Sequence, residues 1–154
     1  MPTRKTIAIA NELVGIVETA AAKLRLLQET EVTLKTSPVK WSKKEILGHL
    51  MDSATNNHQR FIRAQMIHEF SFPGYEQDEW VRRQDYNAKA WTELIDLWRL
   101  YNRHVAHAMR NIPEDKLDTV CRIGNGDPVT LGFIAEDYVT HLKHHLAQLG
   151  VTNV

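Results

Sequence analysis

The chain has 154 residues, of which 43% are hydrophobic and 25% charged, and its 19 basic and 19 acidic side chains cancel. This composition is typical of a soluble globular protein, and we expect a single domain over residues 1–154. The balanced charge does not favour nucleic acid as a partner, because that binding depends on clustered positive charge. One cysteine and the lack of any stretch of roughly 20 apolar residues favour a cytoplasmic protein without a membrane partner.

Apolar side chains recur at helical spacing in four long segments, which predicts an all-α four-helix bundle. The first helix is expected over residues 3–36, with room for a break. The second is expected over residues 42–69, where Ser42 and Glu45 form the S-x-x-E pattern of a capping box.

A long connection, residues 71–86, separates the second and third helices, with room for a short helical turn at residues 78–83. The third helix is expected over residues 87–111. Thr130 is a plausible N-cap for a fourth helix that ends near residue 149. No segment shows the sustained alternation of a strand, so we expect no sheet.

The last predicted helix carries two histidines at a spacing that suits a metal ion. His141 and His145 are four residues apart, so their side chains lie one above the other, on or beside the apolar stripe. Burying two imidazoles without partners is costly, and a shared ion would remove that cost. Two hydrogen-bonded core histidines are the alternative.

A third ligand has to come from another helix, and His49 on the second helix is the best candidate. Ser53, Asn56 and Arg60 follow it in steps of four, three and four, and Asn57 lies near the centre of the inward stripe. Polar groups near the core favour a lined cavity, in which the arginine and the two asparagines could bind a substrate carboxylate or amide. Alternatively, these polar residues form a partly exposed stripe at the edge of the bundle.

Two further residues of the last helix are candidates for the surroundings of the site. Asp137 precedes His141 by four residues and could orient its imidazole, or it could be an ordinary charge near the helix start. Tyr138 lies on the inward stripe. His104 and His107 fall opposite the apolar stripe of the third helix, so we expect them to be solvated.

Three motifs occur in a characteristic order. Residues 41–53 read W-S-x-x-E-x-x-G-H-L-x-D-S, and residues 137–149 read D-Y-x-x-H-x-x-H-H-x-x-Q-L. Between them stand Tyr75, Asp78 and Trp80. Together these motifs resemble the DinB-like superfamily, a group of bacterial metalloproteins that includes damage-inducible proteins and bacillithiol transferases.

The resemblance implies an up-down-down-up four-helix bundle and a three-histidine metal site with His49, His141 and His145 as ligands. It also implies a divalent metal, often zinc or nickel, and a homodimer. Members of the superfamily transfer low-molecular-weight thiols, or isomerise or hydrolyse with a thiol cofactor, and many have no known reaction. No motif in this chain carries the thiol specificity.

An open three-histidine site predicts metal chemistry on a small-molecule substrate. We expect transfer of a low-molecular-weight thiol, such as bacillithiol, to an electrophilic small molecule. Two alternatives stay open: a hydrolase that uses metal-bound hydroxide, and a non-catalytic, stress-associated metal-binding dimer. The sequence assigns no catalytic residue beyond the metal ligands.

Overall fold

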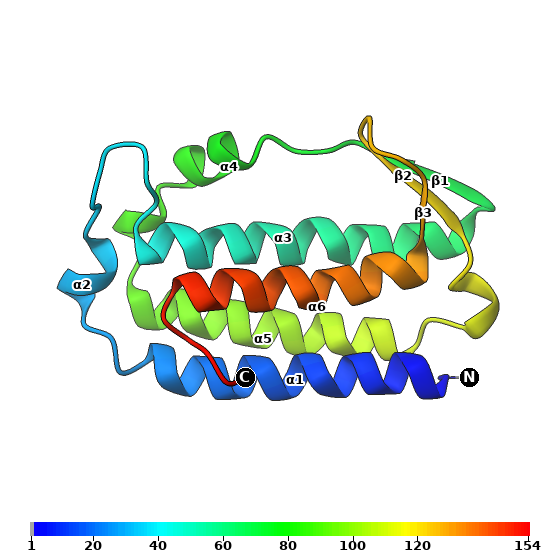
Figure 1. Ribbon diagram of the computed structural model, residues 1–154, viewed down its shortest axis with the longest axis horizontal. Helices are drawn as coiled ribbons and strands as arrows, with labels where there is room; N and C mark the ends of the chain where they lie inside the picture. The colour runs from blue at the N-terminus through cyan, green and yellow to red at the C-terminus, as the bar shows by residue number, and fades with distance from the viewer. Residues whose placement is uncertain (1) are drawn as a thin grey trace.

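Four long helices form the body of the protein in the computed structural model, which describes residues 2–154 (Figure 1). They are α1 (Arg4–Leu24), α3 (Lys43–Arg63), α5 (Trp91–Arg110) and α6 (Leu131–Gln148). α1 and α6 run in one direction and α3 and α5 in the other (Figure 1). The predicted four-helix bundle, its up-down-down-up order and the long connection after its second helix are confirmed.

Side-chain caps fix where α3 and α6, the two helices that carry the predicted metal ligands, begin. The hydroxyl of Ser42 accepts the Glu45 N–H, and the Glu45 carboxylate accepts the Ser42 N–H at 3.0 Å, so the predicted capping box is present. Thr130 caps α6 by accepting the Phe133 N–H at 3.1 Å. These bonds satisfy N–H groups that have no partner within the helix.

The core lies between the four helices, with α1 and α3 both packed against α5 and α6. Leu13, Leu47, Trp98 and Leu142 are among its buried side chains, one from each long helix. Of the helices in residues 2–154, none is long and apolar enough to cross a membrane.

The segment predicted as the first helix is broken, as the sequence allowed. α1 ends at Leu24, and a separate short helix, α2 (Glu29–Thr33), follows it. The Leu24 carbonyl accepts the indole N–H of Trp91 at 2.8 Å, which joins the end of α1 to the start of α5. The same carbonyl accepts the Leu27 N–H at 3.1 Å, so a tight turn and a tertiary contact share it at the end of the helix.

The other boundaries differ less. α3 ends at Arg63 instead of residue 69 and continues as the short 3₁₀ turn η1 (Ala64–Met66). α5 begins at Trp91 instead of residue 87, because Asp85 adopts a left-handed conformation (φ 46°) and the 3₁₀ turn η2 (Tyr86–Ala88) follows it.

The expectation that the chain contains no sheet is wrong. Three short strands, β1 (Glu69–Phe72), β2 (Val120–Ile123) and β3 (Val129–Thr130), form a sheet in the order β1-β2-β3. β1 pairs parallel with β2, and β2 pairs antiparallel with β3. Strands of two to four residues are too short to show an alternating pattern, and β1 and β2 lie far apart in the sequence.

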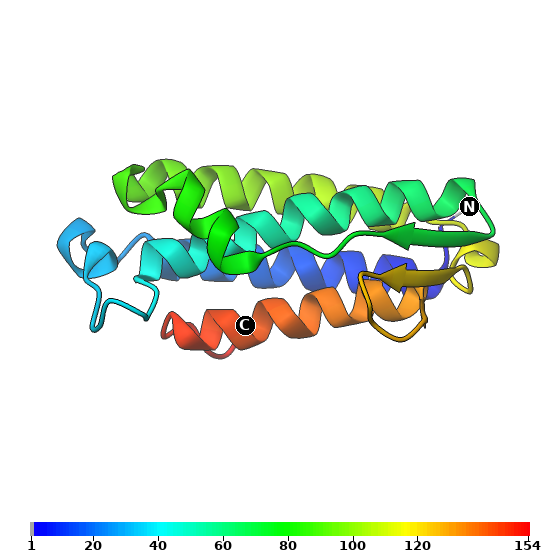
Figure 2. The ribbon, with the colours of Figure 1, turned by 90° about the horizontal axis from the view of Figure 1, so that it is seen from above.

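The long connection returns along the bundle and covers it. After β1 the chain runs back along α3 to α4 (Gln77–Gln84), a helix that contains the predicted helical turn. Viewed from above, residues 73–76 lie over the junction between α3 and α6 (Figure 2). This segment becomes a wall of the site described below.

The end of the connection is held on α3 by a close contact at Gly48. A Cβ atom at this position would lie 2.1 Å from Cδ2 of the Tyr86 ring, so only glycine leaves room for the ring. The Tyr86 hydroxyl donates to the Asp52 carboxylate at 2.6 Å, and the Gln84 amide donates to the same oxygen at 2.8 Å. The contact is adjacent to His49 in the sequence.

We therefore expect Gly48→Ala to lower the free energy of unfolding by about 1–3 kcal/mol, because the added methyl group overlaps the Tyr86 ring. Urea unfolding followed by circular dichroism measures it. Gly15→Ala is the matched control, since an added Cβ there meets nothing within 4 Å. That substitution should stabilise α1 by about 0.5–1 kcal/mol. Equal effects of the two substitutions would contradict the close contact at Gly48.

Candidate metal centre

The three histidines predicted as ligands meet between α3 and α6. Nε2 of His141 and Nε2 of His145, one helical turn apart on α6, are 3.1 Å apart. The ring centroid of His49 lies 5.4 Å from that of His141 and 4.6 Å from that of His145. One ring nitrogen from each residue can be chosen so that all three lie within 4.8 Å of one another. This is a geometry that can hold a metal ion.

The imidazole of His49 lacks hydrogen-bond partners in the described chain, and this also suits a metal ligand. The residue is 0% exposed, and within residues 2–154 neither of its ring nitrogens has a hydrogen-bond partner. A buried polar group without a partner is costly. A cation bound by the lone pairs of all three imidazoles would remove this cost.

The protonation state of the cluster also suits a cation. Burial, with the neighbouring imidazoles as a smaller cause, lowers the pKa of His49 to about 3. Burial also lowers the pKa values of His141 and His145. All three rings are therefore neutral at neutral pH, and a neutral imidazole is the form that donates a lone pair to a metal.

Two residues that sequence reasoning missed position the histidines. Nδ1 of His145 lies 2.8 Å from Oε1 of Gln148, so this nitrogen donates and leaves Nε2 free for a cation. The Trp41 ring packs on His49 with 4.9 Å between ring centroids. In the sequence, these two residues could have been found as a glutamine three positions after a histidine and as a tryptophan directly before a helix N-cap.

A hollow of about 380 Å³ extends from His141 between α3 and α6. Its walls come from both helices, from β2 and β3, and from the connection that precedes α4. The polar or charged side chains besides that histidine are Ser53, Asn57, Arg60, Tyr75, Gln77, Asp137 and Tyr138, and the apolar ones are Ile123, Val129, Phe133 and Ile134.

The residues predicted around the site divide between two faces of α3. Ser53, Asn57 and Arg60 line the hollow beside His141, as do Asp137 and Tyr138 of α6. Asn56 does not line it. Its amide donates to the Asp52 carbonyl at 2.9 Å, and its side chain faces a different hollow.

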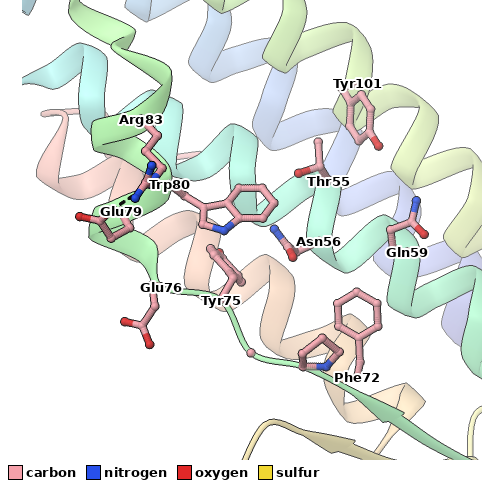
Figure 3. A pocket seen from close by; sticks show the side chains of 12 residues that line it. Thr55, Asn56, Gln59, Phe72, Tyr75, Glu76, Glu79, Trp80, Arg83 and Tyr101 are labelled. Atoms are coloured by element: carbon pink, nitrogen blue, oxygen red, sulfur yellow. Dashed lines mark hydrogen bonds and ion pairs between the residues drawn. The ribbon is translucent and has the colours of Figure 1, made fainter.

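That second hollow has a volume of about 720 Å³, and Asn56 and Tyr75 are among the side chains that line it (Figure 3). Trp80, Tyr101 and Phe72 contribute rings to it, and the Tyr75 and Trp80 ring centroids are 5.2 Å apart. Tyr75 lines both hollows, so residues 73–76 separate them. Sequence reasoning did not anticipate this second hollow.

The two candidates on α6 have different surroundings. Asp137 is exposed and makes no hydrogen bond to His141 in the described part of the chain, but its charge acts to raise the pKa of that histidine. Tyr138 is buried and donates its hydroxyl to the Asn102 side chain, so only its ring faces the hollow.

Of the other histidines, His144 is exposed and its ring centroid lies 5.2 Å from that of His145, whereas the following three lie away from the cluster. His104 and His107 are exposed, as expected. His58 is half-buried, and its Nδ1 lies 2.7 Å from the Tyr101 hydroxyl.

Residues 17–149 match the sequence profile of a family described as the DinB superfamily. A protein of Oceanobacillus iheyensis is 26% identical over 98% of this chain and 89% of its own length. One of Halalkalibacterium halodurans is 24% identical over 80% of this chain and 71% of its own length. Both are named, provisionally, as metal-dependent hydrolases.

Two solved structures share the fold. YfiT from Bacillus subtilis, described as "a probable metal-dependent hydrolase with an unusual four-helix bundle topology", has a TM-score of 0.77 and 17% identity, covering 90% of this chain and 82% of its own. A mycothiol-dependent maleylpyruvate isomerase has a TM-score of 0.76 and 15% identity, covering 99% of this chain and 62% of its own.

The low pKa of His49 predicts how the stability of the metal-free protein depends on pH. The unfolded chain protonates this residue below its ordinary pKa of 6.5, whereas the folded protein does so only near pH 3. The free energy of unfolding should therefore fall as the pH drops from 6.5 toward 3, with at most about 1.4 kcal/mol per pH unit from this residue.

Urea unfolding of chelator-treated protein at several pH values between 7.5 and 4.5 measures this dependence. His49→Gln should show a shallower fall than the unsubstituted protein. His68→Gln, which removes an exposed histidine outside the cluster, is the control and should follow the unsubstituted protein. The same slope for His49→Gln and the unsubstituted protein would show that burial does not suppress protonation of His49.

Proposed function

Since the chain belongs to the DinB superfamily, we propose that it binds one divalent metal ion through His49, His141 and His145 and acts as an enzyme on a small molecule. The observation that carries this proposal is the meeting of three neutral imidazoles, one of them fully buried and without a partner, beside a hollow. A cluster that only stabilised the core would not need to border such a space.

Zinc and nickel are the metals that we propose, because imidazole ligands suit both. Three protein ligands leave a coordination position open, which distinguishes catalytic from structural sites. When bound, the cation would lower the pKa of a thiol or a water molecule held at that position.

For the reaction, we propose transfer of a low-molecular-weight thiol to an electrophilic small molecule. The chain offers no thiol nucleophile of its own, because its one cysteine, Cys121, is buried in β2 and burial raises the pKa of its thiol. The thiol would therefore come from solution. A mycothiol-dependent isomerase with the same fold supports thiol chemistry in this architecture.

The residues around the cluster would position the reactants. Gln148 holds the His145 ring with Nε2 toward the other two histidines. Ser53 and Asn57 offer polar groups to a ligand in the hollow, and Tyr138 with the apolar wall keeps water away from it. Tyr75 separates this hollow from the larger one.

A metal-dependent hydrolase is the second candidate function. The names of the two curated relatives favour it, and the same cation that activates a thiol can activate water. The two functions differ in one requirement, because hydrolysis proceeds without an added thiol.

The metal proposal predicts one equivalent of zinc or nickel per chain. His49→Ala should bind less than a tenth of that after dialysis, because two ligands remain, and it should lose the rise in melting temperature that metal causes in the unsubstituted protein. Mass spectrometry of the metal content and thermal unfolding measure the two effects. His104→Ala should keep one equivalent. Full metal content in His49→Ala would remove this residue from the site.

The reaction is tested by incubating metal-loaded protein with bacillithiol, mycothiol or glutathione and a panel of electrophiles. We expect conjugate formation that needs both metal and thiol, and a loss of at least about 100-fold in kcat/KM for His141→Ala. Turnover without thiol would favour the hydrolase instead. Absence of turnover in both arms, with one metal bound, would rule out both activities for the substrates used.

A further inference from the structure

Arg60 supplies the positive charge of the hollow beside His141 and has almost no partners. Its Nε is buried and, among residues 2–154, has no hydrogen-bond partner. Its one hydrogen bond is a long contact of 3.4 Å from Nη1 to Oδ1 of Asn57. No carboxylate of the described chain lies within 4.0 Å of the guanidinium, so the charge is not neutralised by an ion pair.

Most of the other arginines differ from Arg60 in this respect. Of the nine others within residues 2–154, six lie within 4.0 Å of a carboxylate, and these are Arg25, Arg82, Arg83, Arg99, Arg103 and Arg122. Water reaches these side chains, so pairing adds little to stability. Arg60, whose buried Nε has more need of a partner, has none within that range.

The guanidinium is nevertheless held in place. It lies over the ring of Phe72 at the end of β1, with 5.5 Å from Cζ to the ring centroid. Asn57, which contacts it, is itself fixed, because its amide donates to the Ser53 carbonyl at 2.8 Å. Burial lowers the pKa of Arg60 but leaves a side chain of such high basicity charged at neutral pH. Within the described chain, Arg60 therefore places a charged, oriented guanidinium without an ion-pair partner in the wall of the hollow.

The groups that face Arg60 leave its charge available to a ligand. Tyr75 from the connection and Cys121 from β2 are neutral at neutral pH, because burial raises the pKa of each. The imidazole of His141 is neutral as well. Asp137 of α6 is the carboxylate that lines the hollow, but it is exposed and lies beyond ion-pair distance of the guanidinium.

The position of Arg60 on α3 sets the size of such a ligand. The arginine follows His49 by eleven residues, which corresponds to about 16 Å along the helix axis. Its side chain turns back to contact Asn57, and from that level to His49 the axial distance is about 12 Å. A ligand on the order of 10 Å long could therefore contact both the arginine and the metal cluster, and a hollow of about 380 Å³ can hold one.

We propose that the hollow selects a reactant that carries a carboxylate, bound by the guanidinium of Arg60, with its reactive group toward His141. The planar fork of arginine can bond both oxygens of a carboxylate. A single cation fits a singly charged group better than a phosphate dianion, and Ile123, Val129 and Ile134 provide contacts for an apolar body. The inference rests on the proposed function, because it names the substrate class of that site.

Binding of a simple probe tests this proposal without turnover. The probe is 3-phenylpropionate, its uncharged match is 3-phenylpropionamide, and metal-free protein is used so that a metal cannot bind the carboxylate. In nuclear magnetic resonance titrations we expect the acid to bind at least 10-fold more tightly than the amide and to shift the Nε–Hε signal of Arg60. Equal binding of the two probes, or tighter binding of inorganic phosphate, would overturn the proposal.

Variants assign the effect to one side chain. Arg60→Gln should bind the acid at least 10-fold more weakly, and Arg60→Lys should fall between, since it keeps the charge and loses the fork. Arg63→Gln, an exposed neighbour on the same helix, should bind the acid as the unsubstituted protein does. Unchanged binding of the acid by Arg60→Gln would exclude Arg60 as the carboxylate site.

Metal content separates this inference from the proposed function. Both Arg60 variants should keep one metal equivalent, which also shows that they fold. Selective binding of the acid by a protein that holds no metal would leave the carboxylate site standing while the metal proposal fails. Once a reaction is found, the electrophile is replaced by its methyl ester and, separately, the thiol by an uncharged thiol. The replacement that lowers kcat/KM identifies the reactant that carries the carboxylate.

Discussion

The burial of one imidazole without a partner is the constraint on which the rest of this structure depends. His49 is surrounded by packed side chains, and its two ring nitrogens find no hydrogen bond in the described chain. Such a group normally makes a fold less stable. Its presence becomes intelligible when His141 and His145 place their nitrogens beside it, because three lone pairs can then share one cation. The proposed metal site would link the free energy of the fold to metal binding.

The order of the helices makes this meeting possible. α3 and α6 run in opposite directions, so the second turn of α3, which carries His49, lies beside the last turns of α6. The sheet holds the other end of the bundle, and the connection between β1 and α4 returns over the junction of the two helices (Figure 2). Without that connection, Ser53 and Arg60 would lie on an open surface. With it they line a hollow that borders His141.

The motif around His49 combines several physical roles. Ser42 and Glu45 cap the helix, Gly48 admits the Tyr86 ring, and Asp52 accepts its hydroxyl. One residue of the motif, His49, belongs to the cluster itself. Most of the motif therefore serves to fix the helix and the connection so that the imidazole lies at a defined place.

The sequence by itself determined the four helices, the capping box at Ser42 and the pairing of His141 with His145, because all of these follow from periodicity within one segment. It also pointed to His49, since polar side chains interrupt an inward stripe. The tertiary structure decided the rest: the strands, the division of Asn56 and Asn57 between two hollows, and the isolation of Arg60. The physical reason is that spacing shows which side of a helix turns inward, whereas only the packing of distant segments shows what covers that side.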